Sequence, residues 1–350
     1  MTAAGSSTSS AFPPAIELRG NKHFGPVQAN RDVDLTVPVG TIHGIVGENG
    51  AGKSTLMSIL YGFYQADSGV IEVGGQVCPI HGPEYALAAG IGMVHQHFML
   101  VDIFTVLENI LLGAEGGALL GPGMAAARAE IARLEADYGL EVDPDALVGD
   151  LAVGLRQRVE LLKALYRGAN ILILDEPTGV LTPQEAERLF EILTAMRDRG
   201  VTIILITHKL QEIMAITDNV SVMRAGQMVA HRETAQTTRE ELAELMVGRQ
   251  VLLRVEKSAA DPGDVVLHAD GLSLIDDAGV LRLDGVSLDL RAGEIVGIAG
   301  VTGNGQSELL EVLSGIRPPS RGRLSVHDRV IDHDHPCEPE EMRDLNLAHV

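Results

Sequence analysis

The chain has 350 residues, of which 45% are hydrophobic and 21% are charged, a balance typical of globular domains and a length sufficient for two of them. Its formal net charge is −21, only 3% of its residues are aromatic, and it contains no Trp. An acidic surface repels phosphate backbones and anionic lipid, so the composition argues against nucleic-acid binding. It favours a small phosphorylated ligand that is bound by local geometry.

The N-terminal segment, residues 1–14 (MTAAGSSTSSAFPP), has neither the basic start nor the apolar stretch of a signal peptide, and we expect it to be a disordered tail. No apolar run in the chain approaches the ~20 residues of a membrane-spanning helix. The two cysteines, Cys78 and Cys337, match no metal-ligand spacing, which suits a reducing cytosol. Any work at a membrane is therefore expected to proceed through a partner.

The first motif with a clear chemistry is GENGAGKST, residues 47–55, which matches the phosphate-loop pattern G-x-x-x-x-G-K-[ST]. Apolar residues 42–47 before it predict a buried strand, and residues 53–62 after it predict a helix. In such a loop the backbone N–H groups and the helix N-terminus bind phosphates, Lys53 reaches the β and γ phosphates, and Ser54 binds Mg²⁺. The predicted nucleotide-binding residues are Gly47, Glu48, Asn49, Gly50, Ala51, Gly52, Lys53, Ser54 and Thr55.

Two further strands are predicted at residues 171–175 (ILILD) and 201–207 (VTIILIT), because continuous β-branched runs suit a sheet that is covered on both faces. Between them a helix is predicted. It begins with a capping box of Thr182 and Glu185, has Pro183 at its first position, and ends at Gly200. Strands that alternate with helices in this way predict the α/β class with a parallel sheet.

The strand ILILD ends in two carboxylates, Asp175 and Glu176. Asp175 is suited to hold Mg²⁺, and Glu176 is placed to orient or deprotonate an attacking water. An acidic pair at a strand end is common in ordinary loops. Its assignment to catalysis therefore depends on the phosphate loop in the same chain.

The chain contains an internal repeat. When residues 40–62 are placed over residues 293–315, six glycines coincide at a constant offset of 253 positions, Gly47 on Gly300 among them. The pattern predicts two tandem homologous domains, each with a strand, a phosphate loop and a helix. We place the first domain at residues 15–248, a linker at 249–264 and the N-terminal part of a second domain at 265–350.

Lysine is missing from the second loop, GVTGNGQSE, where Gln306 occupies its position. A loop of this kind either retains a role in nucleotide binding or is a tight turn kept for folding. The sequence of this one segment leaves both alternatives open.

Taken in order, these motifs resemble those of the ATP-binding cassette (ABC) ATPases. Taken singly, Gln96, Phe24 and His208 would be a surface glutamine, a core aromatic and an ordinary helix-start residue. The resemblance implies that Gln96 in MVHQHFML senses Mg²⁺ and the transporter interface, that His208 in LITHKL contacts the γ-phosphate, and that Phe24 in KHFG stacks on adenine. The implied catalytic residues are Lys53, Gln96, Glu176 and His208, and the implied Mg²⁺ ligands are Ser54, Gln96 and Asp175.

The resemblance also implies a fold and a biological setting. The fold is a P-loop NTPase core of the ABC ATPase type with an antiparallel β subdomain and a helical subdomain. Two fused cassettes and the wording HQHFMLVD resemble the ATPase subunits of bacterial simple-sugar and nucleoside importers, the nucleoside branch in particular. Such subunits hydrolyse ATP, pair their ABC domains within or between chains, and lie peripherally on the cytoplasmic face of the inner membrane. Their implied partners are integral membrane permease subunits and an extracytoplasmic solute-binding protein.

Two alternatives remain at this stage. One is an importer of pentoses or galactosides, and the other is a tandem cassette that acts on ribosomes or nucleic acid. The acidic charge weighs against the second alternative.

The sequence departs from the family pattern in several places. Within the LSGGQ-type signature segment, residues 151–158, Ala152 replaces the usual serine and Leu155 the usual glutamine, and residues 179–182 (GVLT) replace SALD. The chain stops before the second copy reaches its own later motifs, so we expect a C-terminally incomplete protein. In the family two cassettes pack head to tail, which would set the altered signature opposite the loop with Gln306. One composite site is then expected to hydrolyse ATP and the other to hold nucleotide or nothing.

Overall fold

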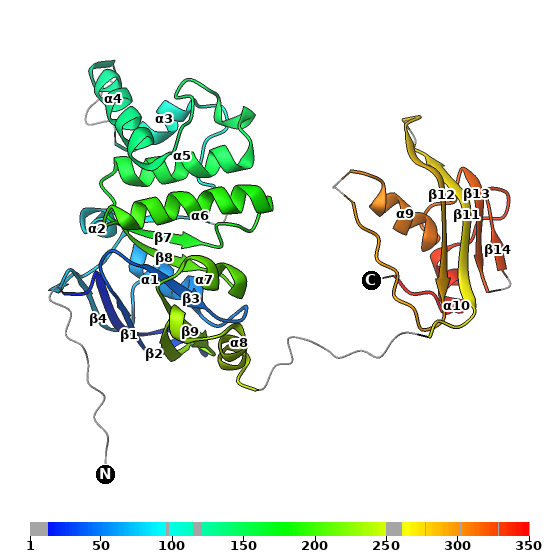
Figure 1. Cartoon of the computed structure of the whole chain (residues 1–350), viewed down its shortest axis with the longest axis horizontal. Coiled ribbons are helices and arrows are strands. Elements are labelled where there is room, and N and C mark those ends of the chain that lie inside the picture. The colour runs from blue at the N-terminus through cyan, green and yellow to red at the C-terminus, as the bar shows by residue number, and fades with distance from the viewer. Residues whose placement is uncertain are drawn as a thin grey trace, which may run out of the picture. The chain divides into compact units, whose positions relative to one another are not determined.

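The chain divides into two compact units, Met1–Leu253 and Arg254–Val350 (Figure 1). The computed structural model describes residues 13–95, 98–114, 121–249, 261–276, 278–300, 303–327 and 329–349. Residues 1–12 of the predicted tail and residues 250–260 of the predicted linker lie outside this set. None of the described helices is both long and apolar enough to cross a membrane.

The core of the first unit is a six-stranded sheet in the order β10-β9-β3-β8-β7-β6. Strands β9, β3, β8, β7 and β6 run parallel, and β10 pairs with β9 in the antiparallel direction. The predicted strands at β3, β7 and β8 are confirmed, and their burial is that of a sheet covered on both faces. The strands are β3 (Ile42–Val46), β6 (Ile91–Val94), β7 (Ile171–Asp175), β8 (Thr202–Ile206), β9 (Asn219–Arg224) and β10 (Gln227–Glu233).

A second sheet of the first unit is antiparallel and has the order β2-β1-β4-β5. Its buried residues, Leu18 and Leu35 among them, share one hydrophobic cluster with helix α1 and one face of the parallel sheet. This sheet therefore covers α1, the helix that follows the phosphate loop. The strands are β1 (Ile16–Phe24), β2 (Val27–Val37), β4 (Ser68–Val73) and β5 (Gln76–Val77).

Helices α3, α4 and α5 gather at one end of the first unit, away from the antiparallel sheet (Figure 1). Their buried residues, such as Ile110, Ile131 and Leu162, belong to a cluster that includes β8 and β9. The predicted α/β class with an antiparallel β subdomain and a helical subdomain is thus confirmed. The helices are α1 (Lys53–Tyr61), α2 (Pro83–Ala88), α3 (Val106–Leu111), α4 (Gly121–Tyr138), α5 (Val153–Tyr166), α6 (Pro183–Asp198), α7 (Leu210–Ile216) and α8 (Arg239–Val247), with 3-10 turns at Val148–Asp150 and Thr234–Gln236.

Helix α6 begins and ends where its local sequence predicts. The Glu185 backbone N–H donates to the Thr182 hydroxyl, and the Thr182 backbone N–H donates to the Glu185 carboxylate at 2.9 Å, which completes the capping box. Gly200, just beyond the last turn, has a φ of +92°. Thr182 also stands where the family usually has aspartate, and here it serves as the N-cap.

The second unit has an antiparallel sheet in the order β12-β11-β13-β14, the same arrangement as β2-β1-β4-β5 in the first unit. The two phosphate-loop segments also share their backbone. Gly52 and Gly305 are the N-caps of α1 and α9, with φ of 101° and 95°. This likeness supports the predicted repeat. The elements are β11 (Val265–Ile275), β12 (Leu281–Arg291), α9 (Gln306–Leu313), β13 (Arg321–Val326), β14 (Arg329–Ile331) and α10 (Pro339–Asp344).

The strand predicted before the second loop is wrong. Residues 294–300 form no strand, and Ile295 is 87% exposed. In the first unit β3 lies between β8 and β9, which follow it much later in the sequence. The described strands of the second unit, β11 to β14, all pair antiparallel with one another and do not flank this run. An apolar run can form a buried strand only where neighbouring strands supply hydrogen bonds to its backbone N–H and C=O groups.

Candidate active site

The phosphate loop of the first unit connects β3 to α1. A side chain at Gly47 would collide with the Met223 carbonyl, and one at Gly52 would collide with the Ala29 carbonyl, while Gly52 also has a φ of 101°. Glycine is therefore required at both positions by close packing and, at Gly52, by backbone conformation as well. Because Gly52 offers no capping side chain, the first N–H groups of α1 remain available to an anion.

The loop forms one wall of a cavity of about 680 Å³, a size suited to a nucleotide. The carboxyl end of β7 and His208, which follows β8, also line this cavity. The lining residues predicted from the sequence are Asn49, Gly50, Ala51, Gly52, Lys53, Ser54, Thr55, Asp175, Glu176 and His208. The structure thus brings together residues that lie more than 100 positions apart in the chain.

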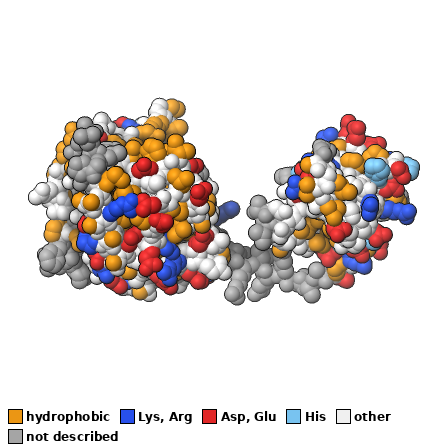
Figure 2. All heavy atoms as spheres, turned by 90° about the horizontal axis from the view of Figure 1, so that it is seen from above, with side chains coloured by type: hydrophobic (Ala, Val, Ile, Leu, Met, Phe, Trp, Pro, Cys, Tyr) orange, Lys and Arg blue, Asp and Glu red, His pale blue; other side chains and the backbone are white. Residues whose placement is uncertain are grey.

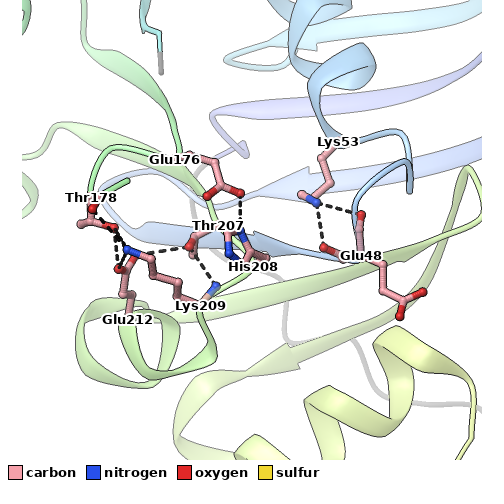
Figure 3. A network of polar contacts seen from close by, with 9 residues as sticks. Glu48, Lys53, Glu176, Thr178, Thr207, His208, Lys209 and Glu212 are labelled. Atoms are coloured by element: carbon pink, nitrogen blue, oxygen red, sulfur yellow. Dashed lines mark hydrogen bonds and ion pairs between the residues drawn. The ribbon is translucent and has the colours of Figure 1, made fainter. Parts of the chain in front are cut away.

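Lys53 is the first residue of α1 and is only 7% exposed. Its Nζ donates to the carbonyl oxygens of Gly47 at 2.7 Å and Glu48 at 3.0 Å, whereas the Glu48 carboxylate points away from it (Figure 3). Burial lowers the pKa of Lys53 from its ordinary value, and the nearby carboxylates of Glu176 and Asp175 oppose this shift. The ammonium group is thus held in the loop by acceptors that phosphate oxygens can replace.

Asp175 ends β7 and faces the same cavity. Burial raises the pKa of its carboxyl above the ordinary value, the neighbouring Glu176 raises it further, and Lys53 opposes both. Within the described residues there is no cluster of three or more His, Cys, Asp or Glu side chains that could hold a metal alone. A hydroxyl and one carboxylate, from Ser54 and Asp175, fit Mg²⁺, which usually binds few protein ligands and completes its shell with phosphates and water.

Glu176 and His208 form a pair at the edge of the cavity (Figure 3). His208 Nδ1 lies 2.7 Å from Glu176 Oε1, so the ionised carboxylate accepts a hydrogen bond from the ring. This contact fixes the orientation of a ring that lines the cavity. Glu176 is also one of the non-glycine residues with positive φ, at 49°.

Two residues that the resemblance assigns to the site are not joined to it by the structure. Gln96 lies outside the described residues. Phe24, at the end of β1, is 42% exposed and packs edge-on against Tyr64 at a centroid distance of 5.1 Å, and it does not line the cavity. Across the β1–β2 turn, however, its strand partner Val27 does line the cavity.

Sequence reasoning missed five lining residues, which come from β2 and from the turn between β9 and β10. They are Val27, Gln28, Ala29, Ala225 and Gly226. The first three follow the predicted aromatic across a tight turn, a spacing that could have indicated them. The turn between β9 and β10 contacts the phosphate loop through a hydrogen bond from the Gly226 N–H to the Ala51 carbonyl at 3.0 Å. No local sequence pattern indicates this contact.

Two residues that depart from the motif pattern, Ala152 and Gln306, each stand at the beginning of a helix. Ala152 is the N-cap of α5 and supplies no side-chain hydrogen bond there. In the second unit, Gln306 begins α9 as Lys53 begins α1, and its side chain lies against Gly300, the repeat counterpart of Gly47. The amide thus takes up the position of the lysine without its charge.

One face of the first unit shows how its charged side chains are distributed (Figure 2). On the face shown in Figure 2, its Lys and Arg side chains are interspersed with acidic and hydrophobic ones and form no broad basic surface. This distribution agrees with the acidic net charge of the chain.

Known proteins share these features. The family model described as "ABC transporter" matches residues 30–179 and 283–347, one segment in each unit. The nucleoside import ATP-binding protein NupA of Lactococcus lactis subsp. cremoris is 48% identical over 94% of this chain and 64% of that protein. The glucose import ATP-binding protein TsgD13 of Haloferax volcanii is 47% identical over 90% of this chain and 62% of that protein.

The chain therefore spans less than two thirds of the length of these two relatives. Among solved structures, the ADP conformation of MJ1267, an ATP-binding cassette of an ABC transporter, has a TM-score of 0.59 and 24% identity, and covers 67% of this chain and 99% of its own. That likeness concerns the fold alone. With a family model that matches most of the chain and both units, the protein belongs to the ABC transporter family.

Proposed function

We propose that this chain is the ATP-binding subunit of an importer and that it hydrolyses ATP to drive uptake of a nucleoside or a related simple sugar. One observation carries the proposal. The phosphate loop with Lys53, the carboxylate Asp175 and the pair of Glu176 and His208 all face one cavity. This is the set of groups that phosphoryl transfer to water requires.

In this proposal the loop N–H groups and the N-terminus of α1 hold the phosphates. Lys53 exchanges its two carbonyl acceptors for β and γ phosphate oxygens. Mg²⁺, which Ser54, Asp175 and Gln96 would hold, supplies positive charge to those phosphates.

Glu176 orients the attacking water and accepts its proton. The water oxygen bonds to the γ-phosphorus while the bond to the β–γ bridging oxygen breaks, which yields ADP and phosphate. His208, oriented by Glu176, contacts the γ-phosphate. Phe24, whose strand partner Val27 lines the cavity, would stack on the adenine base.

The partners and location belong to the same proposal. The chain works with separate permease subunits and an extracytoplasmic solute-binding protein, and it lies peripherally on the cytoplasmic face of the inner membrane. Its two ABC domains pair within the chain or with those of a second chain. The name of NupA supports a nucleoside, and the name of TsgD13 supports a simple sugar as the second candidate solute.

The experiment uses the whole protein with its membrane partners in vesicles that contain ATP, and compares uptake of labelled nucleosides, ribose and glucose. Lys53→Ala removes the loop cation and should abolish uptake and phosphate release. Arg133→Ala, which removes an exposed cation on α4, should leave both unchanged. Uptake that survives in Lys53→Ala would contradict the proposal, and uptake of sugars without nucleosides would select the second candidate.

A further inference from the structure

The backbone at Glu176 is held in an unfavourable conformation. Its φ of 49° lies in the left-handed region, which a residue with a Cβ rarely adopts, and Pro177 follows it. Strain of this kind persists only where the surroundings fix it. Side chains from two helices hold the segment from Glu176 to Thr178.

One set of contacts comes from α7 (Figure 3). Glu212 is 9% exposed, and its carboxylate accepts hydrogen bonds from the hydroxyl of Thr178 on one oxygen and from that of Thr207 on the other, the latter at 3.2 Å. Thr178 is two residues after Glu176, and Thr207 directly precedes His208. A single buried carboxylate thus ties together the two segments that carry the glutamate–histidine pair.

Lys209 completes this network. Its Nζ lies 3.2 Å from Glu212 Oε1 and donates to the Thr178 carbonyl at 3.2 Å. Burial of a carboxylate without a neighbouring cation costs free energy, and its negative charge would repel Asp175 and Glu176. The ion pair lets Glu212 serve as an acceptor close to the site without adding net charge.

A second contact to the same segment comes from α5. Gln157 of α5 donates from Nε2 to the Pro177 carbonyl at 2.9 Å, and both groups are buried. The strained segment is therefore held between α5 and α7.

We propose that Glu212 is a positioning residue for the hydrolysis assigned above: by binding Thr178 and Thr207 together it keeps Glu176 and His208 in their hydrogen-bonded arrangement. The inference rests on the proposed function. Glu212 itself does not line the cavity, so it acts on the reaction through the two segments that it joins.

The test measures kcat, KM for ATP and Tm in the whole protein with its membrane partners. Glu212→Ala should lower kcat about 10- to 100-fold, because small misplacements of catalytic groups are costly, and should leave KM within a few-fold. Glu212→Gln should be intermediate, since one end of its amide still accepts a hydroxyl while the other end is a donor.

The matched control is Thr217→Val. Thr217 is as buried as Glu212, ends the same helix, and bonds to the Thr234 hydroxyl at 2.8 Å rather than to the Glu176 segment. This variant should lower Tm and leave kcat at the wild-type value. If kcat falls in proportion to the loss of Tm in both Glu212→Ala and Thr217→Val, the positioning role is overturned.

Two isosteric variants keep the test decisive if Glu212→Ala does not fold. Thr178→Val and Thr207→Val each remove one hydroxyl and should lower kcat on their own. Combined with Glu212→Gln, each should lower kcat by less than it does alone, because the contact is already weakened. Wild-type kcat in both threonine variants would overturn the inference.

A readout without turnover separates this inference from the proposed function. The NMR chemical shifts of the His208 ring in the full chain should change in Glu212→Ala and stay unchanged in Thr217→Val. If the wild type hydrolyses no ATP but the His208 signal differs between the wild type and Glu212→Ala, the proposed function fails and the positioning role stands. If ATP is hydrolysed and neither kcat nor the His208 signal changes in Glu212→Ala, the positioning role fails alone.

Discussion

At the scale of single residues, the candidate active site holds a charged group that lowers the stability of the nucleotide-free protein. Asp175 is partly buried beside Glu176, and burial followed by that neighbour raises the pKa of its carboxyl. Such a group stabilises the fold only at low pH, below its ordinary pKa, and the contribution is lost as the pH rises through the folded-state value. At neutral pH the ionised carboxylate therefore destabilises the nucleotide-free protein.

This balance gives a prediction for Asp175→Asn. In the absence of nucleotide the variant should have a higher Tm than the wild type at pH 7, and the difference should shrink as the pH is lowered toward 4. Mg²⁺-dependent phosphate release should be lost. Thermal unfolding at several pH values checks the first part, with Glu187→Gln on the exposed face of α6 as the control. An Asp175→Asn variant less stable than the wild type at pH 7 would refute the electrostatic account.

Much of the candidate site could be predicted at the residue scale, because the phosphate loop and the DE pair are local patterns with a fixed chemistry. Lys53 and Asp175 face one cavity as the order of the motifs implies. The contributions of Ala225 and Gly226 could not be predicted in the same way. They depend on how close the turn between β9 and β10 comes to the loop, which the sequence near those residues does not encode.

At the scale of elements, predictions succeeded where the determinants are local. Helix α6 has its cap, its first proline and its terminal glycine within one segment, so its bounds follow from the sequence alone. The strand expected before the second loop failed because its pairing partners are not local. The hydrophobic pattern of residues 294–300 is that of a strand, but a parallel strand also needs neighbours on the sheet.

Strands β3, β9 and β10 carry a chain of polar side chains in which His43 Nε2 and His231 Nδ1 lie 2.7 and 2.8 Å from the Ser221 hydroxyl. His43 and Ser221 are buried. Burial, with a smaller effect of His231, lowers the pKa of His43 to about 4. The unfolded chain therefore binds a proton at His43 before the folded one does. Stability from this group is present above the ordinary value of about 6.5 and is lost as the pH falls toward 4.

We expect this histidine to reduce the free energy of unfolding by up to about 3 kcal/mol between pH 7 and pH 4. Chemical denaturation at pH 7 and at pH 4.5 should show a smaller loss in His43→Gln than in the wild type. The exposed His81→Gln variant serves as the control and should behave as the wild type does. Equal losses in all three proteins would mean that other groups set the acid sensitivity.

At the scale of the whole molecule, the repeat gives two similar loops with different chemistry. Gly52 and Gly305 share their backbone conformation, but Gln306 begins α9 where Lys53 begins α1. A lysine about 4 Å from a phosphate charge contributes roughly 4 kcal/mol at an effective dielectric near 20, before desolvation is subtracted. Positioning groups must change along with the charge for the second loop to become catalytic.

The prediction concerns Gln306→Lys in the whole protein with its permease. It should tighten nucleotide binding at most, and it should not rescue Lys53→Ala, because Ala152 and Leu155 would still replace the usual signature residues. Phosphate release and transport are measured in both single variants and in the double variant. A double variant that recovers the wild-type rate would show that the two sites are interchangeable.

The central claim is that the cavity at the N-terminus of α1 hydrolyses ATP with Glu176 as the group that activates water. Single-turnover phosphate release by Glu176→Gln, with ATP affinity measured on the same protein, tests it most directly. We predict that release slows about 100-fold or more while ATP affinity stays within a few-fold of the wild type. Release at the wild-type rate, or a loss of affinity as large as the loss of rate, would contradict the claim.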